Sequence, residues 1–282
     1  MDTPFNHLKH CRHGQFLFNV NDRFIGKSLD LYGEWKEAEI QLFRHIIKPG
    51  HVVLDVGSNI GPHTLFFAQA VGLEGAVFAF EPQRLFFQTL CANMALNQVV
   101  RAYCYHAAVG ETPGSIPVPV RMPWLKDFNF SALPLREHYG DDCEAVPLIT
   151  IDSLELTRCH FIKVEVVGME LEVLKGAERT IIAHRPFLYV ENDLKGHIGP
   201  DGKPVIRPDN QEKSDTLIRH IDALGYDMFW HVALYFNPAN FLKNPENVFD
   251  NTGAVNMLCV PRNRGHNITA LPKVIVPGPV GK

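Results

Sequence analysis

Short runs of apolar residues that alternate with helix-like segments constrain the fold of this chain more than any other feature. Apolar runs occur at 51–55, 76–80, 99–109, 161–166 and 186–190. Apolar residues at helical spacing mark the segments 30–47, 83–97, 170–184 and 216–225. Runs without polar alternation are typical of strands buried on both faces. The pattern therefore predicts an α/β fold, with a mostly parallel sheet that carries helices on both faces.

The remaining segments interrupt or follow this pattern. Segment 110–147 is rich in proline and predicts one or two strands with a long loop, and the polar segment 195–211 predicts another loop. Two apolar runs, 226–233 and 254–261, have no helix between them. We expect the following organisation: an N-terminal extension over 1–29, one domain over 30–262 with insertions near 110–147 and 195–211, and a tail over 263–282.

Composition narrows the classes of partner. The formal net charge is −4 and no block of Lys or Arg stands out, which disfavours a nucleic-acid partner. None of the 6 cysteines forms a CxxC pair. No secretory signal or bilayer-length apolar run is visible, so we expect a cytoplasmic protein without a membrane partner. The 14 histidines form no HxxxH or HxH cluster near the acidic residues, so we expect no metal site.

The turn after the first apolar run carries the clearest chemistry. It reads Asp55-Val-Gly57-Ser58-Asn59-Ile-Gly61. Ligands of open α/β sheets bind at the carboxyl ends of the strands, where glycines let the backbone approach a ligand closely. The glycines are spaced G-x-x-x-G, unlike the G-x-G-x-x-G of dinucleotide-binding turns. A carboxylate at Asp55 repels phosphates but attracts a cation such as an ammonium or a sulfonium.

A second acidic residue, Glu81, ends the next apolar run and precedes Pro82. A carboxylate at this place can accept hydrogen bonds from both hydroxyls of a ribose. Together with Asp55 and Asn59, Glu81 predicts a site for an adenosine with a positively charged amino-acid tail. The alternative, an oxidoreductase with a nicotinamide cofactor, is disfavoured by the glycine spacing and by Asp55.

Longer segments resemble the FkbM family of methyltransferases, from about 33 to 261. The matching segments are 55–61, 80–82, 161–177, 188–192, 230–231, 236–238 and 256–259. The resemblance implies the class I methyltransferase fold, a Rossmann-like seven-stranded sheet with an antiparallel last strand. It also implies S-adenosylmethionine as cofactor and O-methylation of a hydroxyl on a small molecule, a sugar or a natural product. Cofactor contacts are then expected from Asp55, Gly57, Ser58, Asn59, Gly61, Glu81, Pro82, Ala108 and Glu165.

One motif departs from the family pattern. Where the family usually reads Ile-Lys-x-Asp-Val-Glu-Gly, this chain has Glu165 and Val167 at the two acidic positions. Glu165 keeps the charge of the usual Asp, whereas Val167 removes a carboxylate. A cofactor-binding protein with weakened or no catalysis is therefore a further hypothesis.

Methyl transfer to an alcohol requires an in-line approach and removal of the alcohol's proton. The candidate bases are Glu165, Glu191 and His231, which all follow or occupy predicted strands. Each residue can instead have a structural role: Glu165 can accept a backbone hydrogen bond, Glu191 can form a cap or an ion pair, and His231 can be packed in the core or at the sheet edge. Asn192 and Trp230 are candidates for contact with a small-molecule or glycan acceptor. The sequence leaves open whether the protein forms a homo-oligomer.

Overall fold

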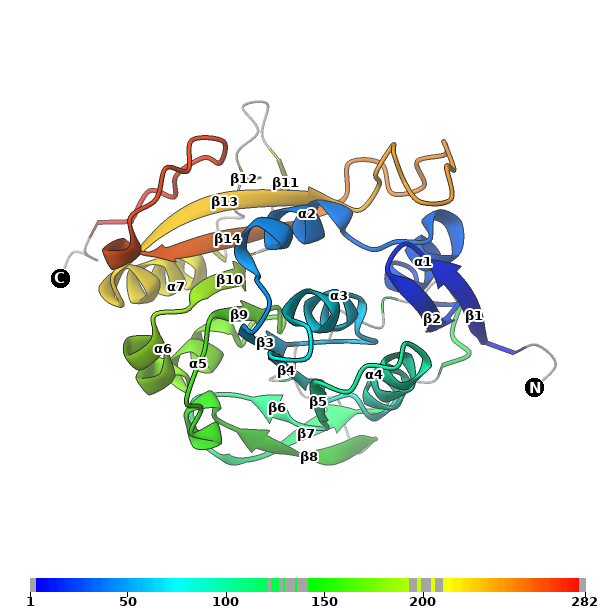
Figure 1. The fold of residues 1–282 in the computed structure, drawn as a ribbon, viewed down its shortest axis with the longest axis horizontal. Coiled ribbons are helices and arrows are strands. Elements are labelled where there is room, and N and C mark those ends of the chain that lie inside the picture. Colours follow the sequence, from blue (N-terminus) through cyan, green and yellow to red (C-terminus); the bar gives the residue numbers. More distant parts are fainter. Residues whose placement is uncertain are drawn as a thin grey trace.

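The computed structural model of the chain describes residues 4–120, 123–126, 129, 135, 142–192, 197–198, 204–205 and 210–278. Within the predicted insertion 110–147, most of 121–141 lies outside the described residues, and so does most of the polar loop 195–211. In the described part, one large sheet lies between two groups of helices (Figure 1). This arrangement is the α/β architecture that the alternating pattern predicts.

The large sheet consists of the apolar runs. Its strands are β3 (Val52–Val56), β4 (Ala76–Phe80), β5 (Ala102–Tyr105), β9 (Phe161–Val164), β10 (Phe187–Glu191), β13 (Tyr226–Leu234) and β14 (Gly253–Pro261). Among the described residues their order is β13-β14-β10-β9-β3-β4-β5. β14 pairs antiparallel with β10 and β13, and the other pairings are parallel. The predicted seven-stranded sheet with an antiparallel last strand is confirmed.

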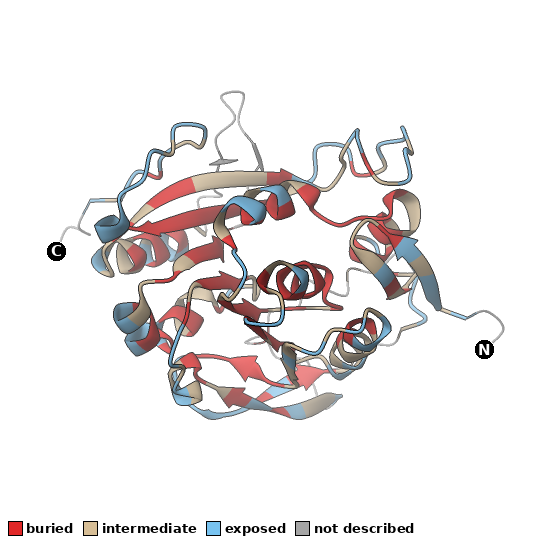
Figure 2. Cartoon of the chain, viewed as in Figure 1, coloured by how far each residue is buried: buried red, intermediate tan, exposed pale blue. Residues whose placement is uncertain are grey.

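Helices cover both faces of this sheet. On one face lie α2 (Glu37–Ile46), α3 (Pro62–Val71) and α4 (Arg84–Leu96), and on the other α5 (Glu170–Lys175), α6 (Glu178–His184) and α7 (Gln211–Ala223). Successive strand residues point to opposite faces. Val53 and Phe161 accordingly pack with α2 and α3, whereas Leu54 and Ile162 pack with α5, α6 and α7. Figure 2 shows the buried residues along the central strands and α3.

The single helix predicted over 30–47 is divided in the structure. Its residues belong to α1 (Ile25–Tyr32) and α2, with a turn between them. Gly33 ends α1 with a φ of 66°, and Lys36 precedes α2 with a φ of 44°. The prediction of one helix is wrong because apolar spacing continues across a turn that tertiary contacts hold.

The helix predicted over 170–184 is also divided, into α5 and α6. A Cβ atom at Gly176 would lie 2.0 Å from the carbonyl oxygen of Gly110. The close crossing of these two backbones separates α5 from α6, and helical spacing carries no signal of such a crossing. α7 begins at Gln211, earlier than the predicted start at 216.

The proline-rich insertion begins and ends in strands, as predicted. The third apolar run forms β5 and then β6 (Ala108–Val109), which leaves the large sheet. β6 pairs with β8 (Cys143–Ile149), which pairs with β7 (Gly114–Pro119). The shorter elements are β11 (His197–Ile198), β12 (Pro204–Val205) and the 3-10 turns η1 (Ile151–Leu154) and η3 (Arg262–Arg264).

The N-terminal extension folds as a hairpin of β1 (Asn6–Cys11) and β2 (Gly14–Asn19). Phe16 and Phe18 are buried in a cluster with residues of α1, α3 and α4. The side chain of Asn93 on α4 accepts the backbone N–H of Leu17 at 2.7 Å and donates to its carbonyl at 3.1 Å. The hairpin and α1 thus lie against the main domain beside α4 (Figure 1).

The described part of the tail, 263–278, lies along the edge strand β13. The backbone N–H of Trp230 donates to the carbonyl of Pro272 at 2.8 Å, and that of Val274 to Met228 at 2.9 Å. Val274 is only 4% exposed. The tail therefore covers the open edge of the large sheet. Among the described helices, none has the length and apolar character needed to cross a membrane.

Candidate active site

Acidic residues stand side by side at the carboxyl edge of the large sheet. Val56 lies opposite Phe80 and Val164 in the strand register. The residues that follow, Gly57, Glu81 and Glu165, therefore form one row. A cleft opens at this row. Five of the expected cofactor contacts line the cleft, namely Gly57, Glu81, Pro82, Ala108 and Glu165.

A larger cavity of about 240 Å³ lies between the N-terminal hairpin, α4 and β7. It shares Gln83 with the cleft, and its wall is mostly apolar. None of the expected site residues lines it. Five of the predicted cofactor contacts thus line the smaller cleft, and none lines the larger cavity.

The turn after β3 is shaped by its glycines. Gly57 has a φ of 82°, and a Cβ atom there would lie 1.9 Å from the carbonyl oxygen of Glu165. Only glycine permits this approach of two loops at the sheet edge. Gly61 has a φ of 89°, and a Cβ atom there would meet the side chain of Leu90 at 2.6 Å. Gly61 thus packs behind the cleft, and Pro62 opens α3 as expected.

The Glu81 carboxylate holds the turn and faces the cleft. Its Oε2 accepts the backbone N–H of Asn59 at 2.9 Å, and its Oε1 accepts that of Gln83 at 2.8 Å. A carboxylate oxygen can accept two hydrogen bonds, so each retains capacity for a ligand hydroxyl. Burial raises the pKa of Glu81 to about 7. Two vicinal ribose hydroxyls match this pair of buried acceptors.

Asp55 is placed differently from the expectation. It stands two residues before Gly57, on the same face of the sheet as the row, and it is fully buried with its side chain hydrogen bonded to Thr64 on α3. Its Oδ2 accepts the hydroxyl of Thr64 at 2.6 Å, and its Oδ1 lies 3.4 Å from Nζ of Lys163. Asp55 is not among the residues that line the cleft, and its contact with a ligand stays a prediction. Asp55 holds Lys163 in place.

Ser58 and Asn59 also serve the turn itself. The hydroxyl of Ser58 donates to the carbonyl of Asp55 at 2.6 Å. The side-chain oxygen of Asn59 accepts the backbone N–H of Ile60 at 2.8 Å, and its φ is 52°. Both residues stabilise the loop conformation that presents Gly57 and Glu81 to the cleft.

Glu165 is held by two lysines. Its Oε2 lies 2.8 Å from Nζ of Lys163, and its Oε1 is hydrogen bonded to Nζ of Lys36. Each lysine side chain is 1% exposed, whereas that of Glu165 is 22% exposed. Burial alone would raise the pKa of Glu165, but the charges of Lys163 and Lys36 lower it well below its usual range. A carboxylate held in this way is a weak base.

A wider polar cluster joins Glu165 to the layer of α2 and α3. Oε1 of Glu39 lies 3.5 Å from Nζ of Lys36 and accepts the amide of Asn256 at 3.0 Å. Oε2 of Glu39 lies 3.1 Å from Nε2 of His63. One ligand atom each from Glu39, His63 and Glu165 lies within 4.8 Å of the others, a spacing that could hold a metal ion. The ammonium of Lys36 already contacts both carboxylates, so we interpret the cluster as an ion-pair network.

The other candidate bases differ in their surroundings. Glu191 lies half-buried at the end of β10, opposite Asn256 and next to Glu165 in the row. Burial lowers the pKa of Lys36, but the charges of Glu165, Glu39, Tyr235 and, as the smallest contribution, Glu191 raise it well above its usual value. Nδ1 of His231 is 2.7 Å from the Tyr189 hydroxyl, and burial lowers its pKa.

The two expected acceptor contacts point away from the cleft. The amide of Asn192 donates to the hydroxyl of Ser214 on α7 at 2.9 Å. The side chain of Trp230 packs against the core between the sheet and α7. Trp230 is adjacent to His231 in a strand, so the two side chains lie on opposite faces. The structure does not bring Asn192 and Trp230 together with Glu81 and Glu165.

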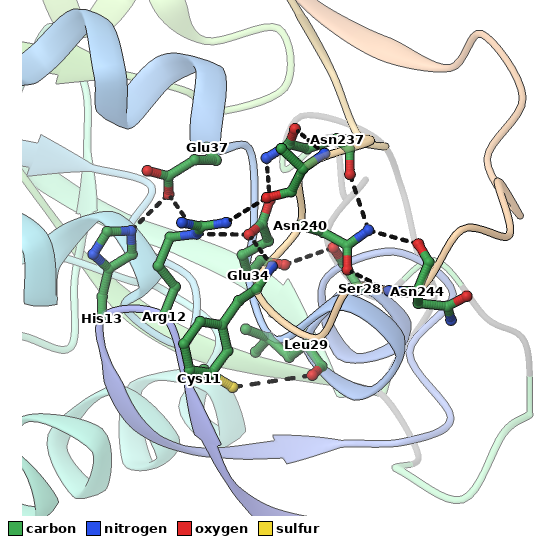
Figure 3. A network of polar contacts seen from close by, with 12 residues as sticks. Cys11, Arg12, His13, Ser28, Leu29, Glu34, Glu37, Asn237, Asn240 and Asn244 are labelled. Carbon is green, nitrogen blue, oxygen red and sulfur yellow. Dashed lines mark hydrogen bonds and ion pairs between the residues drawn. The ribbon is translucent and has the colours of Figure 1, made fainter.

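A network of polar contacts holds the segment before α2 (Figure 3). The Glu34 carboxylate accepts hydrogen bonds from Nε of Arg12 at 2.7 Å and from the amide of Asn237 at 2.7 Å. Glu37 lies 2.7 Å from Nε2 of His13. These contacts tie the N-terminal hairpin and the segment after β13 to the two residues that flank Trp35 and Lys36. The hairpin thus fixes the place of Lys36 in the site.

Comparison with known proteins decides the family. The model of the methyltransferase FkbM domain matches residues 55–228, more than half of the chain. The chain belongs to the FkbM methyltransferase family. It is therefore a methyltransferase, and the alternative of a nicotinamide-dependent oxidoreductase is wrong.

Individual relatives of this FkbM methyltransferase are distant. The hexuronic acid methyltransferase AglP of Haloferax volcanii is 28% identical over 210 residues, which cover 70% of this chain and 77% of that protein. A solved FkbM methyltransferase of Methylobacillus flagellatus is 17% identical, with a TM-score of 0.43 over 78% of this chain and 50% of that one. A SAM-dependent methyltransferase of Aquifex aeolicus is 13% identical, with a TM-score of 0.43 over 86% and 95%.

The departure from the FkbM motif lies in the wall of the cleft. Val167 lines the cleft and has a φ of 39°. A β-branched residue rarely adopts this left-handed conformation, which costs about 1–3 kcal/mol. The neighbouring Glu170 carboxylate accepts the backbone N–H of Gly168 at 3.0 and 3.1 Å and so supports the loop. The backbone is thus held in its conformation although the usual carboxylate is missing.

Sequence reasoning missed the charged residues of this FkbM site that lie outside the turn. Lys163 carried a signal, because a lysine within the apolar run 161–166 must find a buried anionic partner. Lys36 and Glu39 carried none. They lie in a segment of ordinary amphipathic spacing, and Lys36 reaches Glu165 across 129 residues of sequence.

Proposed function

We propose that this FkbM protein uses S-adenosylmethionine to methylate an oxygen of a small sugar-type acceptor. The cofactor assignment rests mainly on the buried Glu81 carboxylate, which directly follows β4 and faces the cleft. Each of its oxygens accepts one hydrogen bond from the backbone and can accept another from a ligand. When bound, S-adenosylmethionine supplies a methyl group on a positively charged sulfur.

The cleft fits the parts of this cofactor. Glu81 accepts hydrogen bonds from the ribose diol. Apolar wall residues, among them Ala108, Val166 and Met169, suit the adenine. Gly57 lets the turn after β3 lie against the backbone of Glu165, whose fixed negative charge favours the cationic end. Pro82 also lines the cleft, next to Glu81.

The acceptor class follows from the relative that acts on a hexuronic acid. Hydroxyl and carboxylate oxygens of such a sugar are both possible nucleophiles, and we favour a hydroxyl. A hydroxyl must lose its proton as the new oxygen–carbon bond forms. Glu191 is the base that we favour, because Glu165 is held by two lysines and His231 is engaged by Tyr189.

Two measurements test this function. Calorimetric titration with S-adenosylmethionine should show micromolar binding. Incubation with the cofactor and a panel of uronic acids and neutral hexoses should then give a methylated sugar by mass spectrometry. Binding without any methylated product across a broad panel would favour the hypothesis of weakened catalysis, for which Val167 is the motivating residue. Absence of binding to folded protein would overturn the proposal.

A further inference from the structure

Lys36 occupies a position in the active site that no motif predicts. Its side chain is 1% exposed, and its ammonium contacts the carboxylates of Glu165 and Glu39. The ammonium also lies over two aromatic rings, 5.4 Å from the centre of Trp35 and 5.7 Å from that of Tyr235. Each of these neighbours favours the charged lysine.

We infer that Lys36 is a positioning residue that acts together with Lys163 to hold Glu165 as a permanent, fixed anion facing the positive charge of the cofactor. Each lysine takes one oxygen of the carboxylate, so Glu165 can neither rotate nor take up a proton without breaking an ion pair. The inference rests on the proposed use of S-adenosylmethionine, because the cationic partner of Glu165 is that cofactor.

The exposure of the three cluster carboxylates supports this assignment. Glu39 and Asp55 are fully buried, whereas the side chain of Glu165 is 22% exposed and lines the cleft. The first two residues thus set the positions of the lysines, and only Glu165 is open to a ligand. An anion fixed before binding costs no reorganisation when the cation arrives.

The charge balance shows why Lys36 is needed. The charged groups around Glu165 and its two lysines come from several elements: Lys163 on β9, Lys36 and Glu39 at α2, His63 on α3, Asp55 on β3, Glu170 on α5 and Glu191 on β10. Glu39, Asp55 and Glu165 share two lysines. Without Lys36, one lysine would remain for three carboxylates. The cluster would then take up a proton much nearer neutrality, and Glu165 is the carboxylate that solvent reaches.

The N-terminal hairpin helps to hold Lys36 in contact with Glu165. Lys36 has a left-handed φ of 44°, which a lysine adopts only at a cost. Glu34 and Glu37 anchor the backbone on both sides of it through Arg12 and His13 (Figure 3). The strained backbone is thus maintained by contacts outside the cleft, and the extension before the methyltransferase domain completes the cofactor site.

The first test measures cofactor affinity by calorimetry for K36M, K36R and the wild type at pH 6 and pH 8. We expect K36M to bind S-adenosylmethionine about tenfold more weakly at pH 8. The deficit should widen at pH 6, and binding to K36M should release an additional proton. K36R keeps the charge and should recover most of the affinity. K9M is the matched control, because Lys9 lies in the N-terminal hairpin, pairs with Asp30 on α1 and does not touch the site.

A double-mutant cycle separates positioning from folding. E165Q should lose about as much affinity as K36M, and K36M/E165Q should lose no more than either, because Lys36 acts through Glu165. The double variant removes both members of the Lys36–Glu165 ion pair if K36M folds poorly, and Glu39 keeps its contacts with Asn256 and His63. Additive losses would overturn the inference, and so would a folded K36M with unchanged affinity and proton release.

A carboxyl NMR titration of Glu165 without cofactor makes the two proposals distinguishable. Glu165 should stay ionised at pH 5 in the wild type and titrate near neutrality in K36M. Equal titration in both would overturn the role of Lys36 whatever the cofactor is. Absence of cofactor binding to the wild type with the expected titration would instead overturn the proposed function.

Discussion

The Glu81 carboxylate accepts the backbone N–H of Asn59 at 2.9 Å, so the residue that faces the cleft also holds the turn after β3. A change at Glu81 therefore acts both on the ligand and on the loop that forms the site. Its burial has a further effect, because it raises the pKa of the carboxyl group from 4.5 to about 7. Two predictions follow from the sign of this shift.

The first concerns stability. Between pH 4.5 and about 7 the folded protein keeps a proton on Glu81 that the unfolded chain has lost. The free energy of unfolding should therefore fall as the pH rises through this window, by at most about 3 kcal/mol. E81Q should lack this decline. Urea denaturation at several pH values measures it, with E74Q at an exposed position as control. An identical pH profile in wild type and E81Q would contradict the prediction.

The second concerns ligand binding. Below about pH 7 Glu81 becomes protonated and loses acceptor capacity, so the affinity for S-adenosylmethionine should decrease on acidification. E81Q should bind about tenfold more weakly at pH 8, as expected for a lost hydrogen bond to a charged group. Calorimetric titration measures both effects. Retention of full affinity in folded E81Q would mean that the ribose lies elsewhere.

A third prediction concerns the close approach between the loop after β3, at Gly57, and the loop after β9, at Glu165. Gly57 and Gly72 both have a positive φ, but a Cβ atom would meet the Glu165 backbone at 1.9 Å in the first case and open space in the second. G57A should therefore cost about 3 kcal/mol or more, whereas G72A should cost about 1 kcal/mol. Thermal or urea unfolding of both variants gives the comparison. Similar losses would show that only the backbone conformation matters.

A fourth prediction concerns the tail. Val274 is buried against the sheet, whereas its neighbour Ile275 is 85% exposed. V274A should lower the free energy of unfolding by about 2 kcal/mol, and I275A should change it by less than about 0.5 kcal/mol. Denaturation curves of the two variants test whether the tail stabilises β13. Equal effects would indicate that the tail is not packed in solution.

Much of the fold could be predicted from the sequence, because buried parallel strands have a distinct local pattern. The run at 161–166 predicts β9, and the glycines of 57–61 predict the turn at the sheet edge. The placement of Asp55 was within reach too. It lies two residues before Gly57 inside a strand of buried residues, so strand alternation places it on the same face as Glu81 and Glu165 but in the interior behind the row.

The remaining features depend on contacts that local patterns do not encode. Helical spacing continues across the turn at Gly33 to Lys36, and the backbone crossing at Gly176 leaves no mark in the sequence around it. Lys36 contacts Glu165 from a segment that the hairpin and the segment after β13 hold through Glu34. The sequence could therefore show the acidic residues of the site. It could not show that two lysines hold Glu165, which is why we favour another residue as the base.

The identity of that base is the subject of the last prediction. Glu191 lies in the edge row next to Glu165, whose carboxylate is held by two lysines, whereas His231 is hydrogen bonded to Tyr189 on the face toward α2. With an acceptor that is methylated, E191Q should lower kcat about 100-fold or more and leave cofactor affinity nearly unchanged. H231Q should change kcat by less than about tenfold, because it is engaged away from the cleft. Loss of activity in H231Q with normal activity in E191Q would instead assign the proton transfer to His231, through the Tyr189 hydroxyl.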